Sequence, residues 1–173
     1  MLKLIDAISD NIPYTAKTTL SMRDLQRLSA RQIGNSIGAG REVYVAVIAI
    51  DDFPSLARRY GPATVDRMLR AATTAIAGAL RPHDALAVHG PGAFVAVLSY
   101  CDLDSAERVC EDLRYAVTST SVIATDLTVS IGLADVGEGE PDAVRAIRRG
   151  EAALQIAQEH GVNRTVIDDL VFA

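Results

Sequence analysis

The sequence has little of several residue types on which common classes of protein depend. It holds two cysteines, no tryptophan and only 5% aromatic residues among 173. Two cysteines are too few for a disulfide framework, and the spacing of Cys101 and Cys110 matches no zinc motif, so both are predicted to be reduced thiols. The shortage of aromatic side chains removes the stacking platforms on which single-stranded nucleic acids bind.

Positive charge is also in short supply. The 17 Lys and Arg residues are outnumbered by 22 Asp and Glu, which gives a net charge of −5. A broad DNA or RNA footprint and a polybasic membrane patch are therefore excluded, and any phosphate-bearing ligand must be bound by a few placed arginines. Asp6, Asp10 and Asn11 interrupt the apolar character of the N-terminus. We predict a cytoplasmic chain with no DNA or RNA partner and no membrane insertion.

What the sequence does have is enough apolar residues, 49%, for one compact domain. Residues 43–50 form a continuous β-branched apolar run, which predicts a central strand covered on both faces. Residues 85–88 and 94–100 are two apolar runs joined by a glycine-rich connection, which predicts a β-hairpin. The full order is helices followed by β-α-α-β-β-α-β-α-β. This order predicts an α/β (α+β) fold with one mixed central sheet covered by helices.

Helical periodicity predicts the covering elements. A short amphipathic helix is expected in the first dozen residues, and a second from 20 to 37 with Leu25, Leu28, Ile33 and Ile37 on one side. Asp52 is expected to cap a helix that begins near Pro54, and Pro141 to open the last helix. We expect residues 1–19 to form an N-terminal helix and connection, and residues 20–173 to form the domain.

Four local motifs carry a family resemblance. Residues 48–53 read I-A-I-D-D-F, residues 90–94 read G-P-G-A-F, residues 129–132 read V-S-I-G, and residues 157–164 read A-Q-E-H-G-V-N-R. In this order and spacing, the motifs resemble those of the GGDEF domain of diguanylate cyclases, over residues 20–168. The resemblance implies the nucleotide-cyclase-like mixed sheet.

The resemblance also implies which side chains catalysis needs. Active members join two GTP molecules with magnesium or a similar ion, which requires carboxylate ligands. The positions of those carboxylates are Ala49, Gly92 and Ala93 here, and the cationic positions of the last motif are Gln158 and Val162. These five positions are therefore interpreted as vestigial. We predict a degenerate GGDEF domain with no catalytic residue, no metal and no cofactor, which is not an enzyme.

Other positions complete the comparison. Pro91 replaces the second glycine of the hairpin motif, and Ala57 stands where the family has a base-reading Asn. Asp66 keeps an acid that contacts guanine in the family, so it is the remnant of a GTP pocket. Asp51 is predicted to cap a helix or to be solvated, and Gly132 to permit close backbone packing. His83, His89 and His160 are predicted to lie at the surface.

A second resemblance concerns product binding. Many family members bind cyclic di-GMP at an inhibitory R-x-x-D site five residues before the hairpin motif, and Arg81 and Asp84 stand at that spacing before Gly90. A guanidinium can donate to a phosphate or to guanine, and a carboxylate can accept from guanine N–H groups. In the family a further arginine from the following helix completes the site, so Arg114 or Arg108 is expected to do so. Arg81 would equally suit a helix C-terminus without any ligand.

These observations lead to three alternative functions. The first is a catalytically inactive GGDEF-like domain that serves as a cyclic di-GMP receptor and relays occupancy to a protein partner or a homodimer. The second is a protein-interaction or dimerisation module that binds no nucleotide. The third is GTP binding without turnover, which rests on Asp66.

Overall fold

The computed structural model describes residues 19–120 and 126–168, which form one six-stranded sheet and five helices. The predicted helix in the first dozen residues lies outside this range. The elements in chain order are β1 (Thr19–Leu20), α2 (Met22–Gly38), β2 (Glu42–Ile50), α3 (Phe53–Tyr60), α4 (Pro62–Ala79), β3 (Ala85–Gly90), β4 (Ala93–Cys101), α5 (Leu103–Thr118), β5 (Val129–Asp135), α6 (Val144–Glu159) and β6 (Thr165–Ile167). From β2 onward this order confirms the predicted one, whereas β1 was not predicted.

The strand order across the sheet is β1-β3-β4-β2-β5-β6. β2 pairs antiparallel with both β4 and β5, and the two outermost strands pair in parallel with their neighbours. Val45 and Ile48 of β2 are fully buried, because helices cover both faces of the sheet. The continuous apolar run therefore is the central strand, as predicted.

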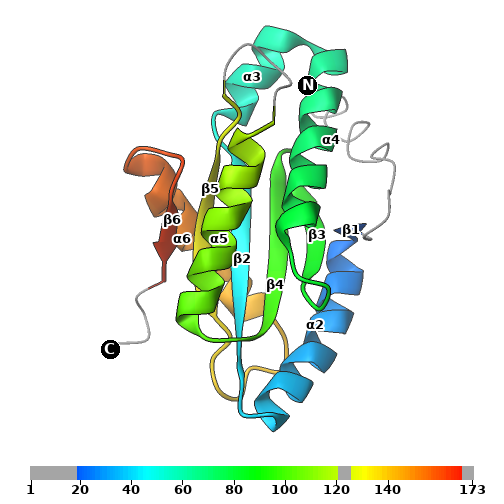
Figure 1. The fold of residues 1–173 in the computed structure, drawn as a ribbon, viewed down its shortest axis with the longest axis vertical. Coiled ribbons are helices and arrows are strands. Elements are labelled where there is room, and N and C mark those ends of the chain that lie inside the picture. The colour runs from blue at the N-terminus through cyan, green and yellow to red at the C-terminus, as the bar shows by residue number, and fades with distance from the viewer. Residues whose placement is uncertain (1–18, 121–125, 169–173) are drawn as a thin grey trace.

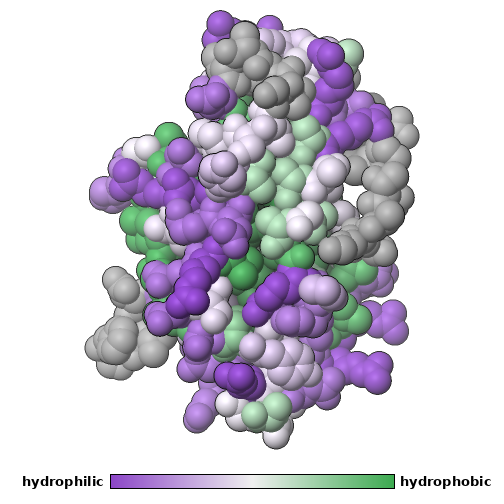
Figure 2. All heavy atoms as spheres, in the orientation of Figure 1, coloured by the Kyte–Doolittle hydropathy of each residue, from purple (hydrophilic) through white to green (hydrophobic). Residues whose placement is uncertain are grey.

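Helices lie on both faces of the sheet (Figure 1), and a hydrophobic cluster fills the space on each side. One face packs against α4 and α5, with Phe94 and Met68 among its largest buried side chains, and the other packs against α2 and α6. Figure 2 shows hydrophilic side chains along α5 and a paler surface over much of α4. No helix in residues 19–120 and 126–168 is both long and apolar enough to cross a bilayer.

The contact of α6 with the sheet depends on glycine. A Cβ on Gly132 of β5 would stand 1.9 Å from the carbonyl oxygen of Gly150 on α6, and a Cβ on Gly150 would stand 2.7 Å from Cγ2 of Val47. The helix backbone thus rests directly on the strand. This geometry confirms the predicted role of Gly132.

The prediction for α2 was partly wrong. Leu25 and Ile33 are buried, but Leu28 is 42% exposed and Ile37 is 50% exposed. The buried face of the helix is completed by Ser29 and Ser36 instead. Small polar side chains fill these positions because the helix lies close to the sheet.

Two predicted helix starts also need correction. The last helix begins at Val144 and not at Pro141, and the Asp142 side chain accepts a hydrogen bond from the Val144 N–H. Asp52 occupies the N-cap position of α3 but makes no capping bond through its side chain, and its φ is +50°. Its backbone carbonyl instead accepts from the N–H groups of Ser55 and Leu56.

Candidate functional site

The hairpin between β3 and β4 carries the motif at residues 90–94. Gly90 pairs with Ala93, so Pro91 and Gly92 are the two turn residues, and Gly92 has a φ of +70°. Proline followed by a residue with positive φ is typical of a type II turn. Ala93 also pairs directly with Ala49 at the end of β2. The structure therefore brings Ala49, Gly92 and Ala93, three of the five positions that were predicted to be vestigial, together at one end of the sheet.

Gly92 lies against the aromatic ring of Phe53. A Cβ at Gly92 would stand 2.7 Å from Cγ of Phe53, which is closer than any ordinary contact. The backbone N–H of Ile50 donates to the Gly92 carbonyl at 2.8 Å, which fixes the turn against the end of β2. A side chain at position 92 would therefore require either the ring or the turn to move.

Asp51 has a structural role that the sequence did not predict. It is 6% exposed, and its carboxylate accepts from the hydroxyls of Thr128 (2.8 Å) and Ser130 (2.6 Å) and from the backbone N–H of Asn163 (3.0 Å). The predictions of a helix cap and of solvation are both wrong. The carboxylate instead joins the end of β2 to β5 and to the segment that enters β6.

The segment that enters β6 has an unusual backbone. Val162 and Asn163 have φ values of +51° and +46°. A left-handed conformation is unfavourable for a β-branched residue. Val162 is 41% exposed, and Gln158 on α6 is also exposed. The conformation is maintained by the hydrogen bond from Asn163 to Asp51.

Arg114 on α5 belongs to the same end of the molecule. Its Nε and Nη2 donate to the side-chain oxygen of Asn163 at 3.3 and 3.2 Å, and its Nη1 pairs with Glu111. Arg114 thus lies beside the Asp51 network.

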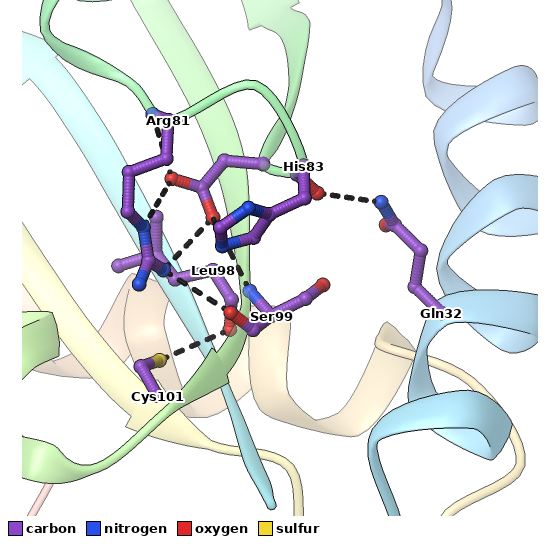
Figure 3. A network of polar contacts seen from close by, with 7 residues as sticks. Gln32, Arg81, His83, Leu98, Ser99 and Cys101 are labelled. Carbon is purple, nitrogen blue, oxygen red and sulfur yellow. Dashed lines mark hydrogen bonds and ion pairs between the residues drawn. The ribbon is translucent and has the colours of Figure 1, made fainter. Parts of the chain in front are cut away.

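Arg81 and Asp84 form an interlocked pair at the other end of β4 (Figure 3). The Arg81 Nε donates to Oδ2 of Asp84 at 3.0 Å and Nη2 donates to Oδ1 at 2.9 Å. Nη2 also donates to the carbonyl of Ser99 at 3.2 Å, and the Ser99 N–H donates to Asp84 at 3.3 Å. The side chain of Asp84 is fully buried, while that of Arg81 is 28% exposed. Only the arginine of this pair faces solvent.

The surroundings of Arg81 stabilise its charged form. Hydrogen bonding to Asp84 raises the pKa of the guanidinium above its already high ordinary value. Burial raises the pKa of the nearby Cys101 thiol, and its Sγ donates to the Leu98 carbonyl. Arg81 therefore remains a fixed cation beside a neutral thiol.

The predicted trio of Arg81, Asp84 and Arg114 does not come together. Ser99, which contacts Arg81, is paired with Val43, and Asp51 lies eight residues further along β2. At ~3.3 Å per residue, the backbone from Val43 to Asp51 spans roughly 26 Å, and Arg114 lies at the Asp51 end of it. Arg108 lies nearer to Arg81 along α5, because the helix begins just after Cys101 and the Arg108 charge acts on Asp102.

Asp66, which was predicted to be the remnant of a GTP pocket, has a partner on its own helix. Asp66 accepts from Nε (2.9 Å) and Nη2 (2.6 Å) of Arg70, one helical turn further along α4. Ala57 packs against the core. Asp66 thus already has a cationic partner.

The three histidines make separate contacts. His89 lies 2.7 Å from Glu151, His160 contacts the carbonyl of Ile156, and His83 packs edge-on against Tyr100. Within the described part of the chain, no three His, Cys, Asp or Glu side chains are grouped so that they could hold a metal ion.

Arginines gather near the hairpin end of the molecule. Arg58 and Arg59 lie in the last turn of α3, and Arg67 and Arg70 lie on α4. Phe53, the first residue of α3, contacts the hairpin turn. Arg70 pairs with Asp66, and Arg58 and Arg67 donate to the hydroxyls of Ser55 and Thr64.

Comparison with known proteins identifies the family. The family model described as the diguanylate cyclase, GGDEF domain, matches residues 17–164. The chain belongs to the GGDEF family. The diguanylate cyclase DosC of Escherichia coli K12 is 30% identical over 150 residues, which cover 84% of this chain and 32% of the relative. The chain thus spans about a third of the length of the curated relatives that it matches.

Solved structures confirm the fold. The GGDEF domain of DgcB from Caulobacter crescentus, in complex with c-di-GMP, superposes with a TM-score of 0.80 at 21% identity, covering 88% of this chain and 92% of that one. The structure of the coiled coil and GGDEF domain of the same protein, also with c-di-GMP, gives 0.72 at 25% identity, covering 82% and 76% of the two chains. The predicted GGDEF-like mixed sheet is therefore confirmed.

Family membership corrects one prediction. The family and the relatives are named for an enzyme activity, the diguanylate cyclase reaction. The prediction that this chain is not an enzyme is therefore wrong at the level of the family. The prediction rested on the absence of carboxylates at residues 49, 92 and 93. The absence concerns three positions, whereas the family match covers residues 17–164.

Some residues around Arg81 and Arg114 were not singled out from the sequence. Ser99 contributes its backbone N–H and carbonyl to the Arg81 pair, and any residue type except proline could supply those groups. Asn163 stands in the recognised A-Q-E-H-G-V-N-R motif, which was a usable signal. Its contact with Asp51 spans 112 residues and could not be read from local spacing.

Proposed function

We propose that this chain is a cytoplasmic signalling module of the GGDEF family that binds cyclic di-GMP through Arg81 and relays its occupancy to a protein partner. The observation that carries the proposal is the oriented, partly exposed guanidinium of Arg81. Asp84 and the Ser99 carbonyl hold two of its nitrogens. A guanidinium that is already immobilised loses little conformational entropy when a ligand binds.

One edge of that guanidinium supports ligand binding. The Nη1 atom of Arg81 takes no part in the hydrogen bonds to Asp84 and Ser99, and the Cys101 thiol lies beside the guanidinium. Arginine donors recognise guanine at O6 and N7, and they also bind phosphate oxygens. In this proposal, Nη1 and the exposed edge of Nη2 contact the ligand, and Asp84 acts as a positioning residue that never leaves the interior.

Arg108 is the better candidate for the second cation. It is exposed on the first half of α5, close to the end of β4. Arg114 is bound to Asn163 and Glu111 at the far end of that helix. The family supports the ligand class, because the DgcB structure with 25% identity to this chain contains c-di-GMP.

Isothermal titration of the nucleotide-free chain with cyclic di-GMP tests the proposal. Arg108→Ala, at an exposed site, and Arg81→Lys, which keeps the charge but loses the fork, are each expected to weaken binding about tenfold or more. Arg114→Ala is the matched control and should bind as the parent chain does. Melting temperatures show whether each variant is folded, and GTP turnover is measured separately by chromatography.

A second candidate function is a protein-interaction or dimerisation module without nucleotide. The complete burial of Asp84 favours it, since the R-x-x-D pair would then serve only the fold. In that case cyclic di-GMP produces no heat with any variant, and Arg81→Lys changes only the melting temperature. Such a result would reject the receptor proposal.

A further inference from the structure

A groove crosses the end of the molecule opposite the hairpin. Its volume is about 790 Å³. It lies between the C-terminal end of α2, the start of β2, the first turn of α5 and the segment after β5. None of the residues that line it belongs to the Arg81 pair or to the hairpin turn. Asp102 and Leu103 directly follow Cys101, which lies beside Arg81, so the groove and the Arg81 pair are at the same end of the molecule.

Apolar side chains from five parts of the chain line this groove. Two of them, Ile37 at 50% and Leu103 at 37%, are among the few large apolar side chains that are exposed in the described part of the chain. The apolar lining residues are Ile33, Ile37, Val43, Leu103, Val136 and Ile167. Exposed apolar surface bordered by polar groups is typical of interaction sites.

Carboxylates dominate the charged lining. They are Glu42, Asp102, Asp104, Asp135, Glu138 and Asp168, against the single cation Arg41. Arg149 pairs with Asp135 and Asp168 from the neighbouring helix, and Glu42 accepts from the Tyr44 hydroxyl. The side-chain carboxylates of Asp104 and Glu138 have no ion-pair or hydrogen-bond partner among residues 19–120 and 126–168. The groove therefore keeps a negative rim.

This charge decides which partners fit. The carboxylates of this rim repel nucleotides and other phosphate-bearing ligands. The same residues are not a metal site, since nowhere in the described chain do three potential ligands converge. A helix with apolar side chains at i, i+3, i+4 and i+7 and with Lys or Arg beside them has matching chemistry. The apolar stems of Lys and Arg can also cover the groove edges while their charges meet the rim.

We infer that this groove binds a cationic amphipathic helix of a partner protein. The apolar side chains of that helix contact Ile37 and Leu103, and its cations pair with Asp104 and Glu138. This inference is independent of cyclic di-GMP binding at Arg81, and either can fail without the other.

A synthetic peptide serves as the probe. It has 15 residues, with leucine at positions 1, 4, 8 and 11 and lysine at most others, and it carries fluorescein for anisotropy titration with the full chain. We expect saturable binding that weakens at least tenfold in Asp104→Lys/Glu138→Lys and at least fivefold in Ile37→Ser and in Leu103→Ser. The matched control is Asp112→Lys/Glu159→Lys, which changes the net charge equally at exposed sites outside the groove. A peptide of the same composition in scrambled order controls for charge alone.

Three results would overturn the inference. The first is no saturable binding. The second is equal weakening in the groove variant and its control, which would mean that net charge alone attracts the peptide. The third is a concentration-dependent dimer of the parent chain that Ile37→Ser abolishes, because a second copy would then occupy the groove.

Discussion

Gly132 and Gly150 lie in direct backbone contact, with 1.9 Å between the position of a Cβ on Gly132 and the carbonyl oxygen of Gly150. Because the obstructing atom is backbone, Gly132→Ala is expected to lower the free energy of unfolding by about 3 kcal/mol or more. Urea denaturation measures this loss. Gly137→Ala is the control, because its Cβ would meet nothing closer than 3.6 Å. Equal losses in the two variants would contradict the contact.

Asp51 is the centre of a second test. Asp51→Ala leaves the hydroxyls of Thr128 and Ser130 and the N–H of Asn163 without their acceptor. We expect the free energy of unfolding to fall by about 3 kcal/mol, since each stranded donor costs roughly 1 kcal/mol or more. Asp52→Asn, at the adjacent exposed position, should change stability by less than about 0.5 kcal/mol. A similar small effect at Asp51 would mean that solvent reaches the carboxylate.

Gly92 offers a test of the hairpin. Gly92→Ala adds a Cβ 2.7 Å from the Phe53 ring at a φ of +70°. Gly40→Ala adds one at nearly the same φ, +66°, with nothing within 4 Å. Both variants lose about 1–2 kcal/mol to the left-handed backbone. Gly92→Ala is expected to lose at least 1 kcal/mol more by overpacking, and equal melting temperatures would show that Phe53 rotates away freely.

Alkaline pH tests the burial of the thiols. Burial raises the pKa of Cys110 far above its ordinary value. The folded chain then retains a proton that the unfolded chain loses above pH ~8.5. Stability is therefore fully present below that pH and declines as the pH rises further. Denaturation between pH 8 and 10.5 should show this decline, and Cys110→Ala should make it shallower. An unchanged slope in the variant would assign the decline to other groups.

The sequence predicted those elements whose structure depends on neighbouring residues in the chain. The unbroken run of residues 43–50 is the central strand, and the Pro91–Gly92 pair marks the hairpin turn. Hydrophobic periodicity mispredicted the buried face of α2, because the method considers apolar residues alone. Two of the residues buried on that face are the serines Ser29 and Ser36. The position of Asp51 depends on hydroxyls that follow it by 77 and 79 residues.

The candidate site was less predictable than the fold. Arg81 and Asp84 were expected to bind a ligand side by side, but they bind each other. The two hydrogen bonds from Arg81 satisfy the buried carboxylate of Asp84. A buried carboxylate without a cationic partner would be costly, so Asp84 pairs with Arg81 and does not point into solvent. The arginine of α5 that lies nearer to Arg81 is determined by where the helix begins relative to the end of β4. No short sequence motif encodes that spacing.

The groove also affects how a partner would arrive. Carboxylates that are far apart in the sequence gather on this one surface, and the net charge of the chain is negative as well. Polycations approaching by diffusion are therefore attracted toward the groove before any contact forms. Raising the ionic strength should shorten the reach of this attraction, so that the encounter becomes slower.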